Sequence, residues 1–186
     1  MLIYSDIKET LQRLDKKFNN VQSRSIRVSN LELCFYAKIA LLEYCGWIEQ
    51  SFDVILQEYI NKQTSAARYQ DLAYKKIIKP VYGFNFEQDF CPLFLSVLGV
   101  RNYEILITKL QSAGEFELLK SQLDTLVTFR NTLAHTCFHK GANLSSFVMS
   151  GHSSTLPAPS AIYHDFFLSL LPIIKRITRM IARMKT

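Results

Sequence analysis

Apolar side chains recur at helical spacing along most of the chain, and the strict alternation that is typical of strands is scarce. The first amphipathic run predicts a helix over residues 6–21, with Ser5 as its N-cap. The apolar residues that share one face of this helix are Ile7, Leu11, Leu14 and Phe18. One apolar face per helix is typical of helices that pack around a common core.

A second and longer helix is predicted to begin at the sequence Ser29-Asn30-Leu31-Glu32. Ser29 and Glu32 have the spacing of a capping box, in which each side chain accepts a hydrogen bond from the backbone N–H of the other residue. Apolar residues then follow at alternating steps of four and three, which is the spacing of a packing seam. They are Leu41, Cys45, Ile48, Phe52, Ile55 and Tyr59. We therefore expect this segment to be the long central helix of a bundle.

The middle of the chain contains shorter helical segments separated by Gly and Pro. A third helix is predicted over residues 66–79 and ends before Pro80, because a proline disfavours helical geometry in the residue that precedes it. Irregular residues flank a short helix over 86–98, and a further helix is expected over 103–111. A strong helical pattern then runs over 115–136.

The remaining residues combine a long loop with a final helix. Residues 139–160 are rich in Gly, Ser and Pro and have no clear period, and a loop of this length is usually functional or mobile. The final helix is predicted to start near Ser160, to kink at Pro172 and to end in a basic segment. The whole pattern predicts one all-α domain over residues 1–186, a bundle of about five to six helices.

Composition narrows the class of protein. The chain is 48% hydrophobic and 20% charged, which argues against intrinsic disorder. Lys and Arg exceed Asp and Glu by 22 to 16, so the net charge of +6 favours an anionic partner. No uncharged apolar run reaches the length of about 18 residues that a membrane span needs, and no membrane partner is expected. The four cysteines lack CxxC spacing, which favours a reducing, cytoplasmic location.

One arginine interrupts the seam of the helix predicted over 115–136. The apolar residues at steps of four and three are Leu119, Leu123, Leu126 and Leu133, and Arg130 occupies the slot between the last two. Removing a guanidinium from water costs several kcal/mol unless it is paired. Arg130 therefore either pairs with a buried acid, for which Glu43 and Glu49 of the second helix are candidates, or opens onto a groove that binds an anion.

Two polar neighbours of Arg130 favour the second alternative. Asn131 and His135 are four residues apart, so they lie about 40° from each other on one helix face. The long side chain of Arg130 reaches the same side. Metal-independent RNA cleavage needs a group with a pKa near 7 and a cation for the charge that grows on the phosphoryl oxygens. His135 and Arg130 supply these two groups, and Asn131 can orient the imidazole or the phosphate.

Residues 130–135, Arg-Asn-Thr-Leu-Ala-His, match the R-N-x-x-x-H form of the R-x4-H motif of HEPN domains. The long second helix, the position of the motif late in the penultimate helix, and the loop before the final helix also resemble the ribonuclease-associated branch of that family (RiboL-PSP-HEPN). The resemblance covers about residues 6–183. HEPN domains are all-helical bundles, and many are ribonucleases of toxin–antitoxin and anti-phage systems.

The resemblance implies a metal-independent endoribonuclease in which a homodimer brings two R-x4-H motifs together across one cleft. It implies that Arg130 and His135 are catalytic and that Asn131 supports them. The partners it implies are RNA, a second copy of the chain and an antitoxin protein. Cys137 stands where the HEPN toxins that are silenced by nucleotide transfer have a tyrosine, so the resemblance does not imply that form of regulation.

Two other interpretations stay open. The chain can be a non-catalytic HEPN module that binds nucleic acid or a partner protein. Arg130 can also be structural, in an ion pair with Glu43 or Glu49. The same two carboxylates can preorganise a catalytic arginine, and in that sense they are candidate supporting residues.

The basic segment of the final helix is a candidate RNA-binding surface. Its cations are Lys175, Arg176, Arg179 and Arg183, and they form either a phosphate-contacting strip or a solvated helix face. Tyr82, Phe84 and Phe86 are candidates for stacking on bases. His135, Cys137 and His139 offer half of a zinc site, but no second cluster has ligand spacing, so we expect no metal and no cofactor.

Overall fold

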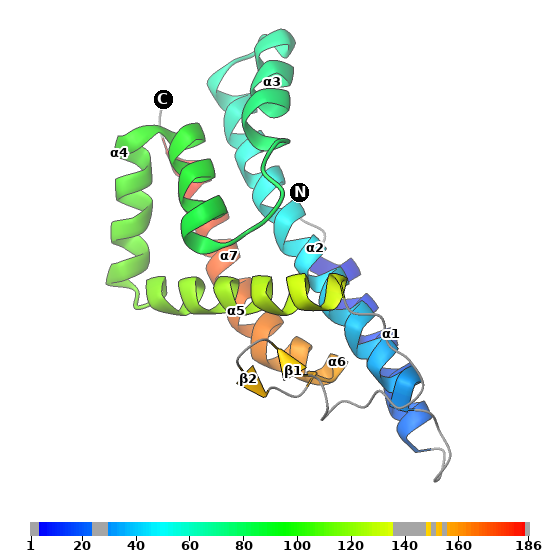
Figure 1. Ribbon diagram of the computed structural model, residues 1–186. Helices are drawn as coiled ribbons and strands as arrows, with labels where there is room; N and C mark the ends of the chain where they lie inside the picture. The colour runs from blue at the N-terminus through cyan, green and yellow to red at the C-terminus, as the bar shows by residue number, and fades with distance from the viewer. Residues whose placement is uncertain (1–3, 24–29, 136–147, 150–151, 154–155, 185–186) are drawn as a thin grey trace. The chain divides into compact units, whose positions relative to one another are not determined.

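The structure is a computed structural model that describes residues 4–23, 30–135, 148–149, 152–153 and 156–184. The all-α fold predicted from the sequence is confirmed for these residues (Figure 1). The exceptions are two short antiparallel strands, β1 (Val148–Met149) and β2 (His152–Ser153), inside the segment predicted to be a loop.

Packing divides the chain into two units. The first unit comprises Ile48–Val127 and Leu170–Thr186, and the second comprises Ile3–Trp47 and Thr128–Ser169. The helices α2 (Asn30–Gln63), α5 (Phe116–Ala134) and α7 (Leu168–Arg183) each contribute residues to both units. The prediction of one domain over 1–186 is not tested by this division and stays a prediction.

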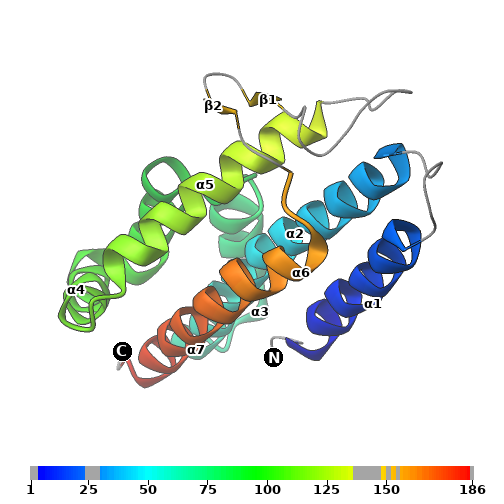
Figure 2. The same ribbon diagram turned by 90° about the horizontal axis from the view of Figure 1, so that it is seen from below.

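In the second unit, α1 (Tyr4–Gln22) packs against α6 (Pro159–Ala161) and the π-helical segment η4 (Ile162–Phe167), as Figure 2 shows for α1 and α6. The core face of α1 is as predicted, with Ile7, Leu11 and Phe18 buried and Leu14 half-buried. The N-cap prediction is wrong. Ser5 lies inside the helix, and its hydroxyl donates a hydrogen bond to Oδ1 of the adjacent Asp6 at 3.1 Å.

An aromatic cluster fills the rest of this core. Trp47 stacks on Tyr44 with ring centroids 5.6 Å apart and meets Phe167 edge-on at 5.5 Å. Tyr4 contacts the same indole at 6.0 Å, and Tyr163 stacks on Phe167 at 5.4 Å. Aromatic pairs at these distances contribute beyond the area they bury. The cluster fixes α1, α2 and η4 to one another.

The long second helix is confirmed. The six predicted seam residues of α2 are all buried, from Leu41 at 0% exposure to Tyr59 at 6%. The helix begins at Asn30, and Ser29 lies outside the described residues, so the capping box is not tested.

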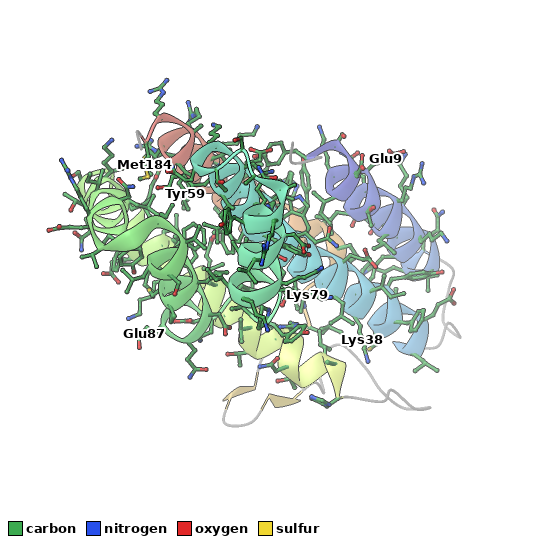
Figure 3. All side chains as sticks on the ribbon, turned by 90° about the horizontal axis from the view of Figure 1, so that it is seen from above. Glu9, Lys38, Tyr59, Lys79, Glu87 and Met184 are labelled. Atoms are coloured by element: carbon green, nitrogen blue, oxygen red, sulfur yellow. The ribbon has the colours of Figure 1, made fainter. Side chains whose placement is uncertain are left out.

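The middle helices lie in the first unit. The predicted helix over 66–79 is α3 (Ala67–Ala73) followed by the π-helical segment η1 (Tyr74–Ile78), and Lys79 before Pro80 is in a turn, as expected. The π-helical segment η2 (Phe86–Phe90) then leads into α4 (Cys91–Ser112). Figure 3 shows Lys79, the exposed residue that follows η1.

A glycine divides α4. Gly99 has φ 73° and ψ 164°, outside helical geometry, so α4 consists of two helical segments, which Figure 1 shows as two rods joined by a bend. The predicted helix over 86–98 is therefore confirmed, whereas the next one begins directly after Gly99 and not at Tyr103. Phe86–Ser112 has the length and hydropathy of a membrane span, but each half is shorter than the roughly 20 residues that crossing requires.

Aromatic residues also build the core of the first unit. Phe52 of α2 meets Phe90 at 5.2 Å and Phe94 at 5.4 Å between ring centroids. Of the three residues proposed for base stacking, Tyr82 is 81% exposed, but Phe84 and Phe86 are 0% and 3% exposed. The stacking prediction is therefore wrong for both phenylalanines, because the hydrophobic effect places them in the core.

Candidate functional site

Arg130 lies on the apolar seam of α5, as the spacing predicts. The four leucines of that seam, Leu119, Leu123, Leu126 and Leu133, are 0% exposed, whereas Arg130 is partly exposed. Arg130 as a residue is thus not sealed in the interior, unlike the four leucines of the seam.

Asn131 and His135 lie beside it at the end of α5 and are both exposed. The helix ends at Ala134, so His135 is the first residue of the following turn. The hydroxyl of Thr132, which lies between the two polar residues, donates a hydrogen bond to the backbone oxygen of Thr128 at 2.9 Å. Asn131 and His135 are therefore the exposed polar residues of the motif, and Arg130 is partly exposed. All three belong to the second unit, at the C-terminal end of α5.

The two candidate supporting carboxylates differ in position. Glu43 is exposed on α2 in the second unit. Glu49 belongs to the first unit and is partly buried one turn before Asp53. Burial, together with the negative charge of Glu49, raises the pKa of the Asp53 carboxyl to about 6. The supporting role of Glu43 and Glu49 toward Arg130 stays a prediction.

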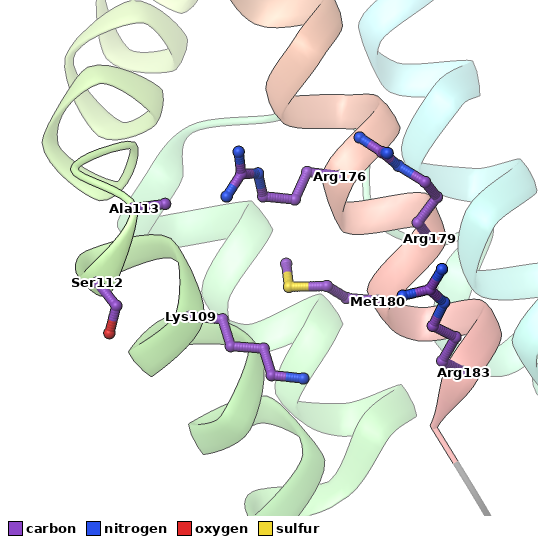
Figure 4. Close-up of a pocket in the computed structure, with 7 residues that line it drawn as sticks. All are labelled: Lys109, Ser112, Ala113, Arg176, Arg179, Met180 and Arg183. Carbon is purple, nitrogen blue, oxygen red and sulfur yellow. The ribbon is translucent and has the colours of Figure 1, made fainter.

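A basic groove, which we define by the cations Arg101, Lys109, Arg176, Arg179 and Arg183, lies between α4 and α7 in the first unit. It consists of two hollows of about 430 and 530 Å³ that share Lys109, Met180 and Arg183. Figure 4 shows Lys109 facing the arginines of α7 across the first hollow. Met184, which Figure 3 labels, lines the second hollow. Tyr59, also labelled there, lies near it, because Asn102 of the lining donates a hydrogen bond to Tyr59 Oη at 3.0 Å.

The groove includes three of the four predicted RNA-binding residues. Arg176, Arg179 and Arg183 line it, and all three are exposed. Lys175 is also exposed on α7 but is not part of the lining. Arg101 and Lys109 were missed at the level of sequence. Their spacing of eight residues, which puts two cations on one helix face, was the available signal.

The isoleucines of α7 that belong to the first unit are buried. Ile173, Ile174, Ile177 and Ile181 are at most 2% exposed. The basic residues that line the groove therefore lie on a helix whose isoleucines are buried in the core.

Cys137, His139 and the side chain of His152 lie outside the described residues. Within the part of the chain that the structure describes, no three His, Cys, Asp or Glu side chains are grouped closely enough to hold a metal ion.

No known family matches this chain. Comparison with the models of protein families, with curated proteins and with solved structures finds nothing similar. The resemblance to HEPN domains therefore depends on residues 130–135 and their helical context alone. What the chain does must be argued from its own chemistry.

Proposed function

We propose that the protein is a metal-independent endoribonuclease of the HEPN type, and that Arg130 and His135 carry the reaction. The observation that supports this proposal is the composition of one helix end. A partly exposed arginine, an exposed asparagine and an exposed histidine lie within six residues there, next to a seam that is otherwise aliphatic and buried. A structural arginine would not need two exposed polar neighbours of these types.

The chemistry follows from these groups. His135 accepts the proton of a ribose 2′-hydroxyl, whose oxygen attacks the adjacent phosphorus. The bond from O2′ to phosphorus forms and the bond from phosphorus to O5′ breaks, which leaves a 2′,3′-cyclic phosphate and a 5′-hydroxyl. The departing oxygen takes a proton from an acid, for which the histidine of a second subunit is suited. Arg130 stabilises the charge on the non-bridging oxygens, and Asn131 holds the phosphate or the imidazole in place.

The proposed biological unit is a homodimer that shares one cleft, in the cytoplasm. The proposed context is a toxin–antitoxin or anti-phage system, in which an antitoxin protein would restrain the nuclease. Two copies of the helix end supply both the base and the acid of the reaction, which is the chemical reason for a shared site.

Incubation of single-stranded RNA with the purified protein in EDTA tests the proposal. We expect cleavage that leaves 2′,3′-cyclic phosphate ends, and we expect His135→Ala to reduce the rate by at least about 10²-fold. Exposed His164 is a matched control, and His164→Ala should leave the rate unchanged. Cleavage that depends on Mg²⁺, or an equal loss in both variants, would contradict the proposal.

A second candidate function is a non-catalytic module that binds nucleic acid. The basic groove of the first unit favours it, because phosphate binding there does not need Arg130 or His135. This alternative predicts no cleavage by the unmodified protein and identical RNA affinities for the unmodified protein and His135→Ala.

A further inference from the structure

The basic groove is formed by two helices that are far apart in the sequence. Arg101 and Lys109 come from α4, and Arg176, Arg179 and Arg183 come from α7. At a rise of about 1.5 Å per residue, the three arginines extend over about 10 Å along α7, and the two cations of α4 are separated by about 12 Å. The positive charge is therefore distributed along the groove. Such a distribution suits a chain of phosphates better than one small anion.

The charges in the groove are poorly neutralised. Of the residues described as lining it, none is Asp or Glu. Glu115 lies 3.0 Å from Nε of Arg176, and Arg179 donates from Nε to the backbone oxygen of Lys175 at 3.2 Å. These two contacts orient arginine side chains, but only one of them supplies negative charge. Cations held side by side with one acid between them attract mobile anions, and release of those anions when a polyanion binds is favourable in entropy.

We propose that this groove binds the phosphodiester backbone of single-stranded RNA. The choice of RNA rests on the proposed nuclease function, whereas the recognition of phosphate rests on the groove itself. Guanidinium groups donate forked hydrogen bonds that match phosphate oxygens. The uncharged lining includes Met180, Ile105 and Asn102 but no aromatic side chain on which a base would stack. Binding is therefore sequence-independent and sensitive to salt.

A membrane surface fits the same residues less well. A basic helix that binds lipid inserts its apolar face between the headgroups. The apolar face of α7 is already packed, since Ile173, Ile177 and Ile181 are at most 2% exposed. The cations also line hollows, and the large apolar residues exposed beside them on α4 are only Val100 and Ile105 among the described residues of its second segment.

Fluorescence anisotropy with a labelled 2′-O-methyl oligoribonucleotide tests the proposal. This probe lacks the 2′-hydroxyl, so it reports binding without cleavage. Each phosphate neutralised on a single strand contributes about −0.7 to the slope of log K against log salt concentration, so the five cations predict a slope between about −2 and −3.5. A slope near zero would overturn the proposal.

Charge-reversal variants locate the site. Lys109→Glu on α4 and Arg183→Glu on α7 should each weaken binding by about tenfold or more at low salt. Lys8→Glu has the same charge change on α1, outside the groove, and should change the affinity less than about threefold. All three residues are exposed, and circular dichroism checks that the variants remain folded.

Three further results would overturn the proposal. They are an equal loss of affinity in Lys8→Glu and Lys109→Glu, no binding of the oligonucleotide, and tighter binding to phosphatidylserine vesicles or polyglutamate than to the oligonucleotide. Failure of the groove proposal can be distinguished from failure of the nuclease proposal. Tight, groove-dependent binding without cleavage contradicts the nuclease alone, and cleavage that is insensitive to Lys109→Glu contradicts the groove alone.

Discussion

Asp124 of α5 accepts two hydrogen bonds from the turn that begins η2. Its Oδ1 atom lies 2.9 Å from Nδ2 of Asn85 and 3.1 Å from the backbone nitrogen of Phe86. Asn85 in turn caps η2, because its Oδ1 accepts hydrogen bonds from the backbone N–H groups of Glu87 and Gln88. One carboxylate thus connects α5 to the segment that carries Phe86 and Phe90 into the core of the first unit.

Loss of this carboxylate should destabilise the protein. Asp124→Ala leaves two partly buried donors without their partner, and we expect the free energy of unfolding to fall by about 1–3 kcal/mol. Asp71→Ala is the control, because its exposed ion pair with Lys75 at 2.8 Å contributes about 0.5 kcal/mol or less. Urea denaturation measures both variants. Equal effects would show that the contact between Asp124 and Asn85 adds nothing beyond surface electrostatics.

Gly99 should not tolerate a side chain. Its φ of 73° and ψ of 164° belong to a region that only glycine adopts readily, so Gly99→Ala should cost about 1–3 kcal/mol even though no atom lies within 4 Å of the added Cβ. Gly46 lies within helix α2 and has equally open space, so Gly46→Ala should stabilise by about 0.5–1 kcal/mol. Thermal unfolding compares the two. An increase in Tm for both would contradict the bend at Gly99.

The carboxyl of Asp53 should make stability depend on pH. Its folded pKa, about 6, is above its unfolded value near 3.8, so the folded state binds the extra proton. The contribution of this carboxyl to the free energy of unfolding is therefore fully present below pH 4, where it is protonated in both states. That contribution is lost as the pH rises from about 4 to 6. Asp53→Asn should remove this loss, so that the variant becomes more stable than the unmodified protein by about 1–3 kcal/mol at pH 7 but not at pH 4.

Urea denaturation at pH 4, 5, 6 and 7 measures this difference for Asp53→Asn. Glu58→Gln removes an exposed carboxylate of the same helix and is the control for the loss of one negative charge. A difference for Asp53→Asn that is constant from pH 4 to 7 would show that the carboxyl titrates normally in the folded protein.

Substitutions of Arg130 distinguish the catalytic interpretation of this residue from the structural one. Because its side chain is partly exposed, Arg130→Met should change the free energy of unfolding by less than about 1 kcal/mol. The same variant should reduce RNA cleavage by at least about 10²-fold, since a donor to the phosphoryl oxygens is lost. Arg130→Lys keeps the charge without the fork and should retain part of the activity. Melting of Arg130→Ala, together with a folded Arg130→Met that still cleaves RNA, would support the structural ion pair.

Much of the fold could be predicted from periodicity. The seam of α2 and the leucines of α5 are buried as their spacing indicates, because repeated apolar positions on one helix face have no favourable place other than a core. The boundaries were less predictable. The N-cap was assigned to Ser5, but α1 begins at Tyr4, because a helix can continue through a serine when tertiary packing supports it. The π-helical segments η1, η2 and η4 have no simple sequence signature.

A candidate site could be predicted from the sequence only where all of its residues belong to one segment of the chain. Arg130, Asn131 and His135 lie within six residues of one another, so their common place at the end of α5 follows from the sequence. The basic groove joins residues more than sixty positions apart, and only packing of α4 beside α7 reveals that Lys109 belongs with Arg183. Similarly, the aromatic residues Phe84 and Phe86 could not be distinguished from Tyr82 until their burial was known.

Neither unit is encoded by one continuous stretch of the gene. Residues Ile48–Val127 need Leu170–Thr186 to complete their core, and Ile3–Trp47 need Thr128–Ser169. A ribosome must therefore synthesise every residue from Arg101 to Arg183 before the groove between α4 and α7 exists. A nascent chain that stops short of α7 has the cations of α4 but not the groove.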